Sequence, residues 1–115
     1  MAKKRVCVEF GMGTSLRRED YTEAAIRALK DALWHNSLNI APAFGFDQSA
    51  MLVDVEIAVQ KPDAVDLDRL SAILPYGQPS FVVKKGGLDI PKPHGGTTLM
   101  ANAAVIVSFD MEPAT

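Results

Sequence analysis

The chain has 115 residues, of which 48% are hydrophobic and 23% are charged, and this composition fits one globular domain over residues 1–115. Its net charge of −2 argues against a nucleic-acid-binding protein, because such proteins need a basic surface. No apolar run approaches the ~18 residues of a membrane span and the chain does not open on a signal peptide, so we expect a cytoplasmic protein without membrane contact.

The first predicted element is a strand that ends in a glycine-rich turn. Apolar and polar residues alternate from Arg5 to Phe10, with Val6, Val8 and Phe10 expected on the buried face. The segment Gly11–Ser15 follows at once, and its two glycines favour a tight turn or a close approach of the backbone to a ligand.

A helix is predicted from Asp20 to about Trp34. Asp20 is a favourable N-cap residue, and Glu23 three positions later completes a capping box. Apolar residues then recur with helical spacing at Ala25, Ala28, Leu29, Ala32 and Leu33. The following residues 37–50 predict an irregular loop whose Ile40, Phe44 and Phe46 pack on this chain's core or on an adjacent subunit.

The second half of the chain predicts three more strands and a short helix. Residues 51–60 alternate most clearly, residues 66–74 carry a capped apolar stripe, and residues 80–84 and 103–110 alternate again. Residues 85–91 predict a turn or a bulged continuation, and residues 92–98 a polar glycine-rich loop.

We therefore expect an α+β fold, a two-layer sandwich in the order β-α-β-α-β-β. A mixed four-stranded sheet would have two helices on one face, and its first two strands would be parallel with a right-handed crossover. The open face would carry polar residues and could serve for oligomer contact; these residues are Glu9, Asp54, Glu56, Lys84 and Ser108.

The strongest candidate site is the junction between the first strand and the first helix. Amide groups at a helix start favour anions, and arginine grips carboxylate or phosphate groups with two hydrogen bonds. The candidate ligand-binding residues here are Gly11, Gly13, Thr14, Ser15, Arg17 and Arg18, and those of two further glycine loops are Lys85, Gly95 and Gly96. The alternative is a tight turn whose glycines serve backbone geometry alone.

Glu9 and His94 are the candidate proton-transfer residues. A carboxylate near other carboxylates on the sheet and a histidine beside glycines are suited to general acid–base chemistry. The alternatives are a solvated or salt-bridged row, which is the commoner outcome for such carboxylates, and an exposed loop histidine. The spacing of histidine and acidic residues predicts no metal site, and we expect no cofactor. The lone Cys7 is expected to be a packed thiol.

Most of the chain resembles the Lin0512 family of small uncharacterised proteins. The resemblance rests on Thr22–Ala32, Asn36–Leu38 and Asn102–Val105, and on the two glycines of the family turn motif G-x-G-x-D-x-H-G. This chain has Ser15 in place of the Asp, Arg17 in place of the His and Arg18 in place of the last Gly. The turn is therefore more cationic than the motif. The layout is also similar to the small folds of trimeric chorismate mutases and reactive-intermediate deaminases, which implies ligand sites at subunit interfaces.

These observations predict a small oligomeric enzyme, or an enzyme subunit, that acts on a small anionic metabolite. The alternative is a binding or assembly subunit without catalysis, and a third possibility is a purely structural oligomer. We expect a homo-oligomer, trimeric or larger, or a hetero-oligomer with a paralogous chain, and no nucleic-acid partner.

Overall fold

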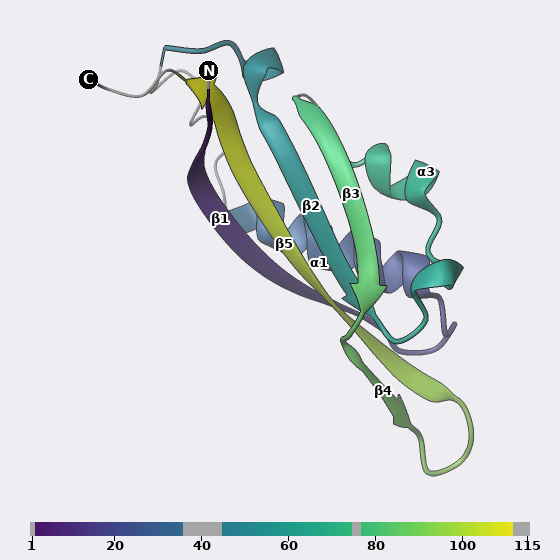
Figure 1. Ribbon diagram of the computed structural model, residues 1–115. Helices are drawn as coiled ribbons and strands as arrows, with labels where there is room; N and C mark the ends of the chain where they lie inside the picture. Colours follow the sequence, from purple (N-terminus) through teal and green to yellow (C-terminus); the bar gives the residue numbers. More distant parts are fainter. Residues whose placement is uncertain (1, 36–44, 75–76, 112–115) are drawn as a thin grey trace.

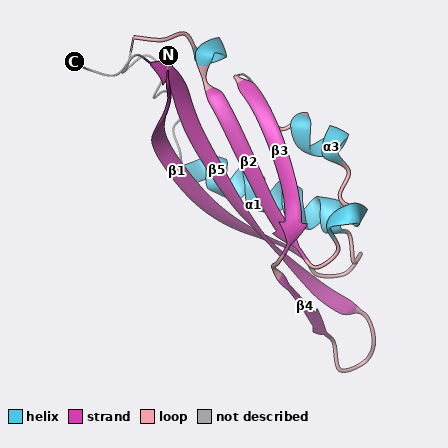
Figure 2. Ribbon diagram, in the orientation of Figure 1, coloured by secondary structure: helices cyan, strands magenta, loops and turns pink. Residues whose placement is uncertain are grey.

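The computed structural model describes residues 2–35, 45–74 and 77–111. It forms a two-layer α+β fold with a mixed five-stranded sheet and two α-helices (Figures 1 and 2). The strands are β1 (Ala2–Ser15), β2 (Leu52–Val59), β3 (Gln78–Lys85), β4 (Leu88–Pro91) and β5 (Thr97–Met111). The helices are α1 (Tyr21–His35) and α3 (Leu67–Ser71), with 3₁₀ turns η1 (Gln48–Ala50) and η2 (Pro62–Ala64).

The strand order is β1-β5-β2-β3, and β4 pairs with β5 alone. β5 runs antiparallel to β1, β2 and β4, whereas β2 and β3 are parallel. β1 and β2 are parallel to each other, as predicted, because both run antiparallel to β5, which lies between them. The sheet has five strands and not the expected four, since residues 88–91 form a separate strand paired with β5, where a turn or a bulged continuation of the preceding strand was predicted.

The helix layer covers one face of the sheet, as predicted. α1 packs on β1, β5 and β2, while α3 contacts α1 and β3. Apolar residues of β2 and β5 alternate inward to form the core with the apolar stripe of α1; the largest fully buried side chains include Phe109, Leu29, Met51, Ile57 and Leu70. Burial of this layer supplies the main driving force for folding.

The two glycines of β1 allow α1 to approach the sheet closely. A Cβ atom on Gly11 would lie 2.2 Å from the carbonyl oxygen of Ala28, and one on Gly13 would lie 2.3 Å from the Ala28 nitrogen. Neither glycine has a positive φ, and both lie inside the strand. The predicted turn at Gly11–Ser15 was therefore wrong: the strand continues to Ser15, and the glycines make room for a helix backbone.

A β-bulge between Arg5 and Cys7 changes which face the following β1 residues occupy. Arg5 pairs with Ser108 on the open face, but after the bulge Glu9 pairs with the buried Val105. Phe10 pairs with Ala104, on the open face, and is 72% exposed. Because directly paired residues share a face, the prediction that Phe10 faces the core and Glu9 the open face was wrong.

β4 and the start of β5 form a hairpin arm that projects beyond the helix layer (Figure 1). The molecule is elongated as a result, with principal extents of 61 × 21 × 20 Å. At the other end, Phe46 stacks on Phe109 with ring centroids 4.7 Å apart, as expected for a loop residue packed on this chain's core. Ile40 and Phe44 lie outside the described residues.

Candidate functional site

An open hollow of about 320 Å³ lies where β1 ends and α1 begins. It is lined by Ser15, Leu16, Arg17, Arg18, Glu23 and Arg27. The last residue of the strand and the first two turns of the helix therefore supply its walls, with the connecting segment 16–20 between them. Three of the six lining side chains are guanidinium groups, which makes the hollow a candidate site for an anion.

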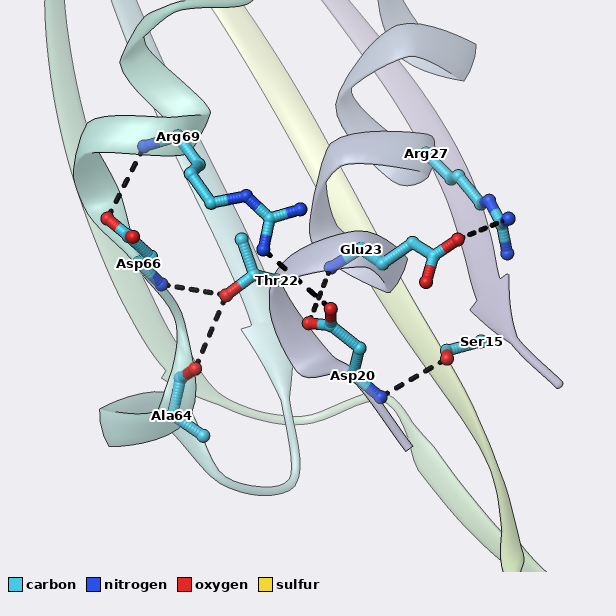
Figure 3. Close-up of polar contacts among 8 residues, drawn as sticks. All are labelled: Ser15, Asp20, Thr22, Glu23, Arg27, Ala64, Asp66 and Arg69. Carbon is cyan, nitrogen blue, oxygen red and sulfur yellow. Dashed lines mark hydrogen bonds and ion pairs between the residues drawn. The ribbon is translucent and has the colours of Figure 1, made fainter. Parts of the chain in front are cut away.

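The start of α1 is held by hydrogen bonds from both sides (Figure 3). The amide of Glu23 donates to Asp20 Oδ1 at 3.0 Å, and the amide of Asp20 donates to Ser15 Oγ at 3.2 Å. Asp20 is thus the helix N-cap that the sequence predicted. The other half of the capping box does not form, because the Glu23 carboxylate pairs with Arg27 at 2.5 Å. The hydroxyl of the buried Ser15 takes its place at the Asp20 amide.

The three arginines of the hollow have different surroundings. Arg27 pairs with Glu23 and also donates to the carbonyl oxygen of Thr14 at 2.6 Å, so it is held in place. Arg17 and Arg18 are exposed, and no described residue supplies a carboxylate partner to either. The hollow therefore carries two uncompensated positive charges beside one fixed ion pair. An anion entering it would find donors that are not already engaged.

The arm reaches the edge of the same hollow. Lys92, which follows β4, donates a hydrogen bond from Nζ to the carbonyl oxygen of Leu16. This contact ties the connection before α1 to the base of the hairpin loop. Local sequence patterns could not predict this contact, because the two residues lie 76 positions apart.

A second, smaller hollow of about 220 Å³ lies beside the first turn of α1. Its lining consists of Glu19, Tyr21, Lys61, Asp89, Thr97 and Leu99. The Tyr21 hydroxyl donates to Asp89 Oδ2, whereas Asp89 Oδ1 is buried with no described partner. Burial, the hydrogen bond to Asp89 and the nearby carboxylates of Asp89 and Glu19 together raise the pKa of Tyr21 to about 12. Tyr21 is therefore a neutral hydrogen-bond donor at physiological pH.

The structure separates the predicted ligand-binding residues. Ser15, Arg17 and Arg18 line the arginine hollow, and Thr14 supplies a carbonyl to Arg27. The predicted glycines Gly11 and Gly13 face α1 and do not line the hollow. Lys85 is exposed at the end of β3, and Gly95 and Gly96 are exposed in the arm loop with positive φ. These three residues do not join the arginine cluster.

The two predicted proton-transfer residues lie far apart in one chain. Glu9 sits beside Val105 on the helix side of the sheet, whereas His94 is in the exposed loop before Thr97. At ~3.3 Å per strand residue, the stretch of β5 from Thr97 to Val105 alone spans roughly 26 Å. Glu9 instead accepts a weak 3.8 Å contact from Cys7 Sγ. Burial and this carboxylate raise the pKa of the Cys7 thiol, so Cys7 stays protonated and packed.

Among residues 2–35, 45–74 and 77–111, no group of three or more histidine, cysteine or acidic side chains is placed to hold a metal ion. Within the same residues, no helix has the length and apolar character needed to cross a membrane.

The fold and the hollow define a small α+β domain with a cationic pocket at a strand–helix junction. The chain belongs to the Lin0512 family, described as conserved hypothetical proteins, whose model matches residues 5–107. It is also similar to the crystal structure of an FtsZ-like protein of unknown function from Nostoc punctiforme. That protein is 32% identical, with a TM-score of 0.87 over 96% of this chain and 99% of the other. No curated protein matches the sequence.

Proposed function

We propose that this protein binds a small anionic metabolite, such as a carboxylate or phosphate compound, in the arginine hollow. The observation that carries the proposal is the pair Arg17 and Arg18, which line a hollow of about 320 Å³ and lack a carboxylate partner among the described residues. Arg27 is fixed by Glu23 beside them, so its position does not depend on the ligand. A free guanidinium pair next to a fixed one suits a ligand with more than one anionic oxygen.

The residues that line the hollow support the same proposal. Ser15, Arg17 and Arg18 are the three residues at which this sequence departs from the family turn motif, and all three line the hollow. The three departures replace an acid by a hydroxyl group, an imidazole by a guanidinium group, and a glycine by a second guanidinium group. They move the local charge in the direction that favours an anionic ligand.

The hollow of a single chain is better suited to binding a ligand than to catalysing a reaction. A proton-transfer step at the hollow would need a free acid or base there. Among the described residues that line it, Glu23 is the one acidic side chain, and it pairs with Arg27. Glu9 and His94 lie elsewhere. We therefore favour a binding subunit of an oligomer, and an enzymatic role would require a catalytic group from a second chain.

The proposal is tested by thermal unfolding with a panel of anions at constant ionic strength. The panel would include inorganic phosphate, pyrophosphate, malate and citrate, each measured on the wild type and on Arg17→Ala/Arg18→Ala. At a ligand concentration of 100 times Kd, binding adds about 2.7 kcal/mol of stability, which raises Tm by roughly 10 °C for a domain of this size.

The matched control is Lys85→Ala, which removes an exposed cation outside the hollow. We expect at least one anion to raise Tm in the wild type and in Lys85→Ala, and no rise in the double variant. Equal rises in the wild type and the double variant, or no rise with any anion, would refute the proposal.

A further inference from the structure

The face of the sheet opposite the helices carries large apolar side chains in contact with solvent. Phe10, Met12 and Val82 are 72%, 55% and 51% exposed, and all three project from this open face. Pairing places Phe10, Ala104, Glu56 and Val82 in one row across β1, β5, β2 and β3. Exposed apolar residues that gather on one surface mark an interaction site, whereas scattered ones need no explanation.

The same face has a depression next to its most prominent side chain. A hollow of about 190 Å³ is lined by Phe10 and by the small residues Ala58 and Ala104, with Glu56 and Lys84 at its side. The surface thus carries a protruding aromatic ring and an adjoining recess whose lining includes two alanines. A patch that has both features can match a copy of itself across a twofold axis.

The charges of the face favour a copy of the same chain over a charged partner. Lys84 is paired with Glu56, and Lys3 is paired with Asp54 at 2.6 Å. Arg5 and Asp110 also lie on this face, opposite Ser108 and Lys3, and no described carboxylate pairs with Arg5. The described main-sheet face thus carries three cations (Lys3, Arg5, Lys84) and three carboxylates (Asp54, Glu56, Asp110), so it has no excess of either sign with which to attract nucleic acid or an anionic membrane. Two such faces can meet with the Glu56–Lys84 and Lys3–Asp54 pairs left intact, so that these four charges keep their partners in the interface.

The arm extends this surface. Leu88 and Ile90 of β4 are 53% and 54% exposed. They pair with Met100 and Thr98, which lie on the open face because they continue the alternation of Asn102 and Ala104 along β5. The apolar surface therefore runs from the main sheet onto the hairpin. The added surface of the arm is relevant because a stable interface buries roughly 800 Å² on each partner.

We propose that a second copy of this chain docks on the open sheet face about a twofold axis, with Phe10 of each copy seated in the recess beside Ala58 and Ala104 of the other. The helix faces would then lie outward, and two sheets would pack face to face as in a β-sandwich. This inference is independent of the anion proposal, because the arginine hollow lies at the strand–helix junction and shares no lining residue with the recess.

Sedimentation equilibrium over a range of protein concentrations tests the interface. We expect the wild type to form a dimer or a larger even-numbered assembly, and Phe10→Glu to raise the dissociation constant by about 30-fold or more, as for a central aromatic anchor. Met12→Lys is the second variant and should weaken association in the same direction. Both side chains are exposed in one chain, so circular dichroism should show that the variants remain folded.

The matched control is Trp34→Ser, which removes an 85% exposed aromatic residue from α1, in the opposite layer. Its dissociation constant should stay within about twofold of the wild-type value, because surface substitutions away from an interface have small effects. A wild-type chain that remains monomeric or forms a trimer would overturn the inference. So would folded Phe10→Glu and Met12→Lys variants that associate like the wild type, or an equal loss of association in Trp34→Ser.

Discussion

Asp20 holds the start of α1, and through it the wall of the arginine hollow. Its side chain accepts the Glu23 amide, and its own amide donates to Ser15. Replacing Asp20 by Ala removes the cap, and we expect a loss of about 1 kcal/mol in the free energy of unfolding. Urea denaturation measures this loss. Asp63→Ala, at an exposed acidic residue of η2, should change stability by less than about 0.5 kcal/mol. Equal midpoints for Asp20→Ala and the wild type would contradict this role.

Tyr21 makes stability depend on pH in the alkaline range. Its pKa rises from 10.0 in the unfolded chain to about 12 in the folded one, through burial first and then the hydrogen bond and charge of Asp89. The neutral form is thus favoured by folding, so its contribution is complete below pH 10 and is lost as pH rises through about 12.

The test for Tyr21 is urea denaturation of the wild type and Tyr21→Phe between pH 8 and 12. The variant should be less stable below pH 10, because Asp89 loses its donor, and the difference should shrink steadily toward pH 12. Subtracting the two profiles removes the titration of lysines, which is common to both proteins. A difference that stays constant up to pH 12 would show that the folded chain does not raise the pKa of Tyr21.

At the scale of elements, the contact between β1 and α1 depends on two glycines. A methyl group on Gly11 would lie 2.2 Å and 2.4 Å from backbone atoms of Ala28 and Ala32. Backbone atoms cannot move aside as a flexible side chain can, so Gly11→Ala should cost about 3 kcal/mol or more in the free energy of unfolding. The matched control is Gly95→Ala in the arm loop, where an added Cβ meets nothing within 4 Å but φ is +103°.

Thermal and urea unfolding of the two alanine variants separate steric overlap from backbone strain. Gly95→Ala should cost only about 1 kcal/mol, the expense of an unfavourable φ. If Gly11→Ala were no more destabilising than Gly95→Ala, the close packing of helix on strand would be disproved.

The elements that the sequence predicted best are those whose pattern depends on local physics. The strand at Leu52–Val59 alternates between buried and half-buried residues as expected, and Asp20 and Asp66 cap their helices because capping involves residues close in sequence. The residues of β1 were assigned to the wrong faces of the sheet, because a single bulge before Cys7 inverts the alternation of buried and open positions. No residue type in the sequence identifies the position of such a bulge. Likewise, glycines in a strand and glycines in a turn look alike until a helix packs against them.

At the scale of the whole molecule, the strand topology determines which contacts at the site can be predicted from the sequence. Ser15, Arg17 and Arg18 are neighbours in the chain, so their place at one hollow was predictable. The link from Lys92 to Leu16 and the pair Tyr21–Asp89 join residues 76 and 68 positions apart. These contacts arise because β4 pairs with β5, whose other edge pairs with β1, and the local pattern of residues 85–91 does not contain that information.

The central claim is that anions bind at the arginine hollow, and NMR titration of the ¹⁵N-labelled protein tests it most directly. Phosphate, pyrophosphate, malate and citrate would each be added at constant ionic strength, with backbone amide and arginine Nε signals followed. We predict that at least one anion causes saturable shifts at Ser15, Arg17, Arg18 and Arg27. Shifts confined to Lys85, Gly95 and Gly96, or no saturable shift with any of the four anions, would contradict the account.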